Sequence, residues 1–149
     1  MSVYDYLDRE QAIVRLLRSW NDRIWAREHN SEKIAYVRTR LMKTTQSIGS
    51  SPVKGGVSSH EEQLINGLNQ IDRLEREIRE ADETQKELET HWVRLTDEER
   101  MVLREMYIDW DKDNRRPIDR IRELLHVERS EAYAKVRSAK ARLAGLVFW

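Results

Sequence analysis

A long series of residues at intervals of three or four constrains this chain more than any other feature. The series extends over residues 60–95, and its members, all apolar except one glutamine, are Leu64, Leu68, Ile71, Leu74, Ile78, Ala81, Gln85, Leu88, Trp92 and Leu95. Such spacing is typical of the narrow seam of a coiled coil. It predicts one long helix that packs lengthwise against another helix.

The first 42 residues offer a partner for that helix. No helix breaker occurs between Val3 and Met42, and a second apolar stripe is formed by Val3, Tyr6, Ile13, Leu17, Trp20, Ile24, Ile34, Val37 and Leu41. The polar residues 27–31 interrupt this stripe and could start a new helix at Ser31, so the region is expected to be either one long helix or two helices with a kink there. Trp20 and Trp25 are five residues apart, so one of them is expected outside the stripe, against a partner.

Residues 44–59 (TTQSIGSSPVKGGVSS) are rich in Gly, Ser, Thr and Pro and predict a loop or flexible linker. Two long helices joined in this way form an antiparallel hairpin. Packing within the hairpin explains the seam without a dimer, but the remaining apolar side favours a homodimer. Lys54-Gly55-Gly56 lacks the spacing of a phosphate-binding loop and follows no predicted strand.

The last third of the chain contains signals for three shorter helices. Thr96-Asp97-Glu98-Glu99 is a capping box that begins the first of them. Its expected buried side is Met101, Val102, Leu103, Met106 and Tyr107. A second helix follows Pro117, with apolar positions at Ile118, Ile121, Leu124 and Leu125, and a third has Ala132, Val136, Ala139 and Leu143 on one face. Three helices around one small core are the layout of a helix-turn-helix domain.

The expected fold is therefore all-α. Residues 1–94 are expected to form a long, coiled-coil-like helical hairpin with its linker at about residues 44–59. Residues 95–149 are expected to form a three-helix helix-turn-helix domain.

The third of these helices is basic on the side that its apolar face leaves outward. From Arg129 onward the chain carries five Lys or Arg and one acidic residue, an excess that favours phosphate. The helix is expected to reach base edges in the major groove of double-stranded DNA with Arg129, Ser130, Tyr133 and Arg137. Phosphate contacts are expected from Arg115, Arg116, Lys135, Lys140 and Arg142. A merely solvated charged face is the alternative reading.

Net charge does not oppose this prediction, although the 27 Lys and Arg equal the 27 Asp and Glu. Residues 61–100 carry six basic and thirteen acidic side chains, whereas both flanking regions are net basic. The chain is polarised rather than uniformly neutral, and local fields depend on that arrangement.

Catalytic and metal-binding chemistry is not indicated. The chain has no cysteine, and its four histidines show no metal-ligand spacing. Residues 109–117 alternate Asp and Asn but lack the Gly and Glu of a calcium loop. We expect no enzyme, no metal and no cofactor.

A cytoplasmic protein without membrane contact is expected. No apolar run approaches the roughly 18 residues of a membrane span. The first residues, MSVYDYLDREQ, lack the form of a secretion signal.

The order of these parts resembles the ArpU/RinA-type phage transcriptional regulators, whose C-terminal domain is similar to region four of sigma factors. The likeness is carried by the SSPVKGG link, the acidic helix after it, LTDEERMVLREMYI, and IDRIRELLHVERSEAYAKVRSAKARL. It implies a phage-encoded regulator in the bacterial host cytoplasm, an activator of late packaging, morphogenesis or lysis genes that binds promoter DNA. It leaves contact with host RNA polymerase open.

The sequence departs from that family around the turn. Arg122 follows Ile121 where the family has Ala, His126 replaces the usual Gly, and Glu128 replaces the usual Ser cap. Arg122 and His126 predict a wider or tilted turn, and Glu128 is a weaker cap than Ser. The loop at 109–117 is also longer than in the family.

Two other functions fit the same features. A small terminase subunit, which packages DNA, also combines a helix-turn-helix with a coiled coil, but it would form a large ring. A protein-binding adaptor would bind RNA polymerase or another partner through its acidic hairpin and the Trp149 end, and would have no direct affinity for DNA.

Overall fold

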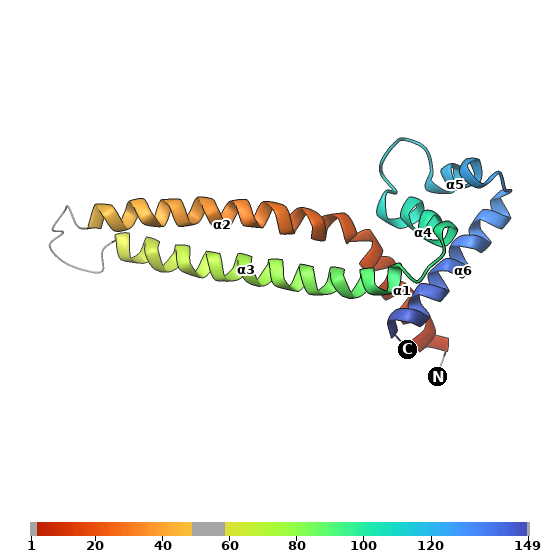
Figure 1. The fold of residues 1–149 in the computed structure, drawn as a ribbon, viewed down its shortest axis with the longest axis horizontal. Helices are drawn as coiled ribbons and strands as arrows, with labels where there is room; N and C mark the ends of the chain where they lie inside the picture. Colours follow the sequence, from red (N-terminus) through yellow and green to blue (C-terminus); the bar gives the residue numbers. More distant parts are fainter. Residues whose placement is uncertain (1–2, 49–58, 149) are drawn as a thin grey trace. The chain divides into compact units, whose positions relative to one another are not determined.

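The computed structural model describes residues 3–48 and 59–148. These residues form helices joined by turns and loops, with no strand among them, in accord with the all-α prediction. The elements are α1 (Val3–Arg18), α2 (Trp20–Ile48), α3 (Ser59–Trp92), α4 (Asp97–Leu103), η1 (Arg104–Ile108), α5 (Pro117–Leu125) and α6 (Arg129–Phe148) (Figure 1).

The chain divides into two compact units, and the division differs from the one expected at residue 95. The first unit combines residues 1–22 with residues 85–149, and the second consists of residues 23–84. The first helix lies with the C-terminal region because α1 packs against α6 and η1, where Ile13 and Leu17 are fully buried. A boundary drawn along the sequence misses this association, since its two parts are separated by the whole of the second unit.

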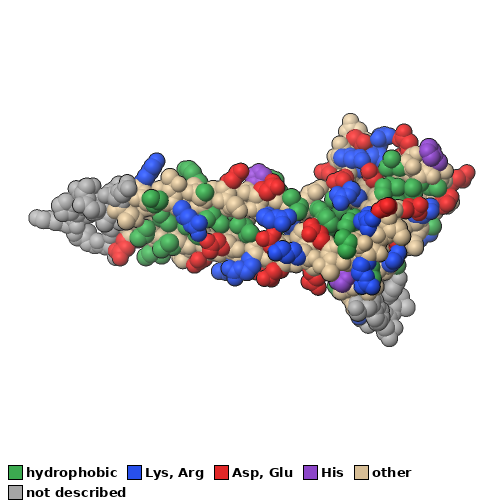
Figure 2. Space-filling view, in the orientation of Figure 1, with side chains coloured by type: hydrophobic (Ala, Val, Ile, Leu, Met, Phe, Trp, Pro, Cys, Tyr) green, Lys and Arg blue, Asp and Glu red, His purple; other side chains and the backbone are tan. Residues whose placement is uncertain are grey.

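The second unit is made of the facing parts of α2 and α3, which lie side by side (Figure 1). Ile34 and Val37 of α2 form its core with Ile71 and Leu74 of α3, and Leu41 and Ile78 pack against this cluster. Hydrophobic side chains run between the two helices in Figure 2, with charged ones beside them. Ion pairs join Arg27 to Asp82 at 3.3 Å and Arg38 to Glu75 at 2.9 Å.

One glycine in the middle of α3 is explained by this packing. A Cβ atom on Gly67 would lie 2.5 Å from Cδ2 of Leu41, well inside van der Waals contact. The missing side chain lets Leu41 of α2 approach the backbone of α3, which offsets the low helix propensity of glycine.

The N-terminal helical region breaks at Ser19, between α1 and α2. Residues 27–31 lie inside the continuous helix α2, so of the two predicted alternatives the kink at this position is wrong. The Ser19 hydroxyl and the Ser19 amide both donate to the Arg15 carbonyl, at 2.8 Å and 3.1 Å. Ser31 begins no helix, since it lies inside α2, where its hydroxyl donates to the Arg27 carbonyl at 2.9 Å.

The helix before the predicted linker extends further than expected. α2 continues through residues 44–48, which were expected in the loop, and α3 begins at Ser59. Residues 49–58 of the expected linker lie outside the described residues.

The two tryptophans of α2 lie on different faces, as predicted. Trp20 is buried, and its ring centroid is 5.1 Å from that of Trp92, with the Arg104 guanidinium over both rings. Trp25 is 52% exposed and stacks on His29 at 4.1 Å.

The predicted capping box begins α4. The Glu99 amide donates to the Thr96 hydroxyl at 3.1 Å, and the Thr96 amide donates to the Glu99 carboxylate at 2.9 Å. These reciprocal bonds satisfy two amides that the first helical turn leaves without partners.

The helix widens after Leu103 into η1, a turn of π-helix that the sequence did not predict. The Asp109 amide donates to the Arg104 carbonyl at 2.7 Å, which spans one residue more than an α-helical bond. The extra residue shifts the inward face of the helix. Val102, Leu103, Glu105, Tyr107 and Ile108 are buried, whereas Met101 and Met106, expected inside, are only partly buried.

The turn between α5 and α6 contains a residue in left-handed conformation. His126 ends α5 and has φ 56° and ψ 46°. It occupies the position at which the phage regulators that the sequence resembles usually have glycine. The Glu128 carbonyl accepts from the Ala132 amide at 2.9 Å, so α6 begins directly after Glu128. The predicted inward face of α6 is confirmed, since Ala132, Val136, Ala139 and Leu143 are buried.

His126→Gly is expected to stabilise the protein. An L-residue with a side chain is strained in the left-handed region, whereas glycine adopts it freely. We expect the free energy of unfolding to rise by about 1 kcal/mol, measured by urea denaturation. His126→Ala keeps the strain and is the matched control. Equal stability of the Gly and Ala variants would contradict the prediction.

Candidate nucleic-acid interface

The first half of α6 presents polar and basic side chains to solvent. Arg129, Ser130 and Arg137 are exposed, together with Ala134 between them. Tyr133 is partly buried, and the Arg129 guanidinium lies 6.0 Å from the centre of its ring. These four predicted groove residues therefore share the N-terminal half of one helix, and three of them are exposed.

Three of these residues form, together with Lys140, a stripe along α6. Arg129, Tyr133, Arg137 and Lys140 follow one another at intervals of four, four and three, which aligns side chains on one helix face. We call them the α6 stripe. At 1.5 Å per residue it is about 16 Å long. In the described part of the chain, no carboxylate forms an ion pair with its three cations.

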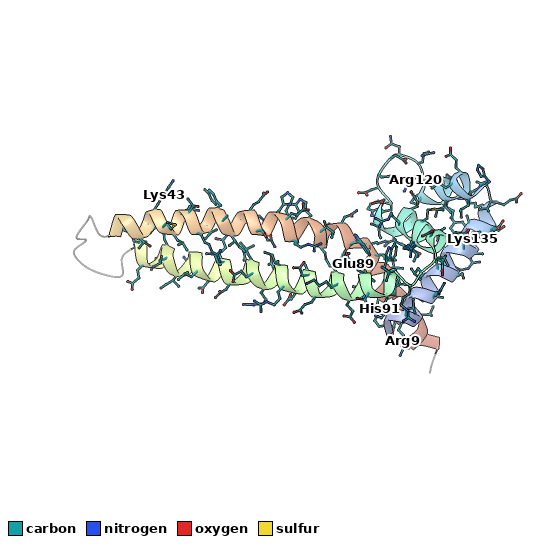
Figure 3. All side chains as sticks on the ribbon, viewed as in Figure 1. Arg9, Lys43, Glu89, His91, Arg120 and Lys135 are labelled. Atoms are coloured by element: carbon teal, nitrogen blue, oxygen red, sulfur yellow. The ribbon has the colours of Figure 1, made fainter. Side chains whose placement is uncertain are left out.

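The cations on the opposite flank of α6 are paired within the protein. The Lys135 ammonium donates to the Glu98 carboxylate at 2.7 Å, and Arg142 pairs with the Glu99 carboxylate (Figure 3 labels Lys135). The bond to Glu98 raises the pKa of Lys135. These contacts fasten α6 to α4. Both residues were predicted to contact phosphate, and the structure engages both with carboxylates of their own unit.

Glu99 has two roles in this fastening. Burial raises the pKa of its carboxyl group, but the hydrogen bonds from Thr96 and the charge of Arg142 outweigh that effect, and the net pKa is lowered. The same carboxylate therefore caps α4 and holds Arg142.

The two arginines predicted in the loop before α5 differ in their surroundings. Arg115 is exposed and forms ion pairs with Asp113, at 3.3 Å, and with Glu123. The hydrogen bond and charge of Asp113 raise its pKa. Arg116 is exposed and has no carboxylate partner in the described part of the chain. Only Arg116 of this pair has its charge uncompensated.

Arg120, which the sequence analysis did not single out, organises the loop. Its side chain is 1% exposed, and its Nε donates to the Glu105 carboxylate at 2.9 Å. Its Nη1 donates to the Asp113 carboxylate at 3.1 Å. The guanidinium also donates to the backbone carbonyls of Glu105, Asp109, Trp110 and Arg115. One buried side chain thus ties η1 and the loop to α5.

Glu105 completes this buried network. The Lys112 ammonium donates to its second carboxylate oxygen at 2.6 Å. Burial raises the pKa of Glu105, but the hydrogen bonds and charges of Lys112 and Arg120 outweigh it, and the net pKa is lowered. The carboxylate is therefore ionised at neutral pH.

The lowered pKa of Glu105 predicts acid sensitivity. A carboxylate whose folded pKa is depressed stabilises the protein fully above its ordinary pKa of 4.5, and this contribution is lost as the pH falls through the lower folded value. We expect thermal melts to show the melting temperature falling steeply below pH 4.5. Glu105→Gln should be less stable at neutral pH but should flatten this part of the profile. An unchanged profile in that variant would contradict the assignment.

No family model matches the chain, and no curated protein or solved structure matches it either. No helix in the described ranges combines the length and apolar composition that a membrane span requires. Residues 3–48 and 59–148 contain no cluster of three or more His, Asp or Glu side chains able to hold a metal ion.

Proposed function

We propose that this protein is a DNA-binding transcription regulator in which α5 and α6 form a helix-turn-helix. The observation that supports this most directly is the α6 stripe, whose three cations are left without carboxylates while their neighbours on the other flank are neutralised. Solubility alone does not explain why the unpaired cations are all on one side of α6 and the paired ones on the other. Binding to phosphate and base edges does explain it, because the cations that contact DNA need to be free of carboxylates of the protein.

The order of elements supports the same proposal. In helix-turn-helix proteins the second helix lies in the major groove, and its N-terminal residues contact bases. Here α6 follows a short turn after α5, and its N-terminal side chains Arg129 and Ser130 are exposed. The positive end of the helix dipole at the same place favours an approach to phosphate.

The chemistry of the stripe suggests roles for its members. Arginine forms paired hydrogen bonds with the O6 and N7 atoms of guanine, the commonest specific contact in the major groove. Arg129 and Arg137 are assigned this role, with Tyr133 and Ser130 beside them. Lys140 and Arg116 are assigned to phosphate, because their charges are not paired within the described protein.

The biological role follows the family resemblance described above. We propose a phage-encoded activator of late genes that binds promoter DNA as a homodimer. Residues 23–84, with their paired α2 and α3, would supply the dimerising hairpin, and residues 95–148 the helix-turn-helix. Two such domains in a dimer would read half-sites about one helical turn apart.

The decisive experiment is to map which DNA the purified protein protects in the genome segment beside its own gene. Protection of a discrete site, with an affinity that falls as salt rises, supports the proposal. The mass in solution should be that of a dimer, and a large ring would favour the terminase function instead. A protein that binds no DNA at any salt concentration would be an adaptor.

A further inference from the structure

A groove between α1 and α6 lies next to the α6 stripe, within the same compact unit. It is lined by one residue of α6, Lys140, and by the α1 residues Leu7, Glu10, Gln11, Val14, Arg15 and Arg18. Lys140 belongs to both features, since it is also the last member of the stripe. The groove is thus a continuation of the stripe from α6 onto α1.

The groove carries a positive charge that the protein does not neutralise. Arg15 and Arg18 are exposed, and neither forms an ion pair in the described part of the chain. The Arg18 guanidinium lies 6.0 Å from the centre of the Tyr107 ring. With Lys140 there are three cations against one carboxylate, that of Glu10. Such a surface attracts an anion.

We propose that α1 is a second DNA-contacting element, in which Arg15 and Arg18 bind the phosphate backbone of the duplex that α6 reads. This inference rests on the proposed function. It adds a binding surface in the N-terminal region, whereas the sequence assigned DNA contact only to residues after 114.

The dimensions of α6 favour duplex phosphate as the ligand. Its 20 residues extend about 30 Å, whereas the major groove is about 12 Å wide. If the N-terminal half of α6 reaches the bases, its later turns lie beside the phosphates that border the groove. Lys140 is in those later turns, and the groove of Arg15 and Arg18 begins at Lys140.

The contact would be independent of base sequence. Arginine bound to phosphate raises affinity for every sequence alike and increases the dependence of affinity on salt. Each phosphate contact contributes about 0.9 to the slope of log affinity against log salt concentration. The proposal therefore predicts a change in this slope with no change in sequence preference.

The test compares the full chain with its Arg15→Gln/Arg18→Gln variant on the duplex that the wild type protects. We expect the slope to fall by about 1.8, so that the loss of affinity between about 50 and 200 mM salt is roughly tenfold smaller than for wild type. The ratio of specific to non-specific affinity should not change. Arg76→Gln/Arg79→Gln removes the same charge from exposed positions of α3 and should leave the slope unchanged.

Two further variants guard against a folding defect. Arg15→Gln alone leaves the contact of Arg18 with Tyr107 intact and should lower the slope by about 0.9. Arg15→Lys/Arg18→Lys keeps both charges and should restore the wild-type slope.

The outcomes separate the inference from the proposed function. Specific binding by both wild type and the Gln double variant with equal slopes would overturn the role of α1 and leave the proposed function standing. A changed sequence preference in the double variant would also overturn a phosphate role. Absence of DNA binding by the wild type would overturn both proposals.

Discussion

Arg120→Met is expected to destabilise the unit formed by α1 and the C-terminal helices by about 3–5 kcal/mol, a large part of the stability of a small domain. The substitution removes the only side chain that satisfies both Glu105 and Asp113 together with four backbone carbonyls. Lys112 remains beside Glu105, but it cannot reach all of those acceptors with one ammonium group. Acceptors left buried without donors account for most of the cost.

Urea denaturation followed by tryptophan fluorescence measures this effect, since Trp20, Trp92 and Trp110 all belong to the affected unit. Arg116→Met is the matched control: the residue precedes the same helix and is exposed, so its loss should change stability by less than about 0.5 kcal/mol. Arg120→Lys should rescue only part of the loss, because lysine lacks the planar fork of donors. Equal unfolding midpoints for the Met variants would show that the buried network contributes nothing.

Local sequence signals predicted the features that depend on neighbours in the chain. The capping box at Thr96 needs only residues three apart, and the inward face of α6 needs only helical periodicity. Both agree with the structure. The intervals of three or four likewise identified Ile71, Leu74, Leu88 and Trp92 as inward positions of α3, although Leu68 in the same series is 52% exposed.

Features that depend on distant parts of the chain were not predictable in this way. The association of α1 with α6 joins residues more than a hundred positions apart, and no periodicity records it. The π-helical turn at η1 shifts the inward face by one residue, which misplaced Met106. The acid-rich loop of Asp109, Asp111 and Asp113 before α5 was a weak signal for Arg120, because Lys112, Arg115 and Arg116 in the same loop are equally plausible partners.

The predictions for the DNA-contacting residues also show this difference between local and distant signals. Spacing along α6 was sufficient to put Arg129, Ser130 and Arg137 on an outward surface. It could not reveal that Lys135 and Arg142 face Glu98 and Glu99, because those carboxylates come from α4. Charge counted along a helix therefore overstates the cations that are available to a ligand.

Arg129→Gln/Arg137→Gln is expected to weaken specific DNA binding strongly while leaving the fold intact. Each arginine that makes a paired contact with guanine contributes about 1–3 kcal/mol of discrimination. Their joint loss should weaken binding to the protected site by roughly 30-fold to 10⁴-fold, whereas non-specific affinity should fall much less. Both side chains are exposed, so the melting temperature should hardly change. Equilibrium binding to the protected duplex and to a scrambled duplex measures both affinities.

The opposite flank of α6 supplies a control of equal charge for that experiment. Lys135→Gln/Arg142→Gln removes the same two charges from the same helix, but from side chains that already hold Glu98 and Glu99. This variant should lower the melting temperature and change sequence preference little, because its residues fasten α6 to α4. If the two double variants instead weaken all duplexes to the same extent, α6 attracts DNA only through its net charge. In that case the segregation of paired and unpaired cations on α6 does not define a reading surface.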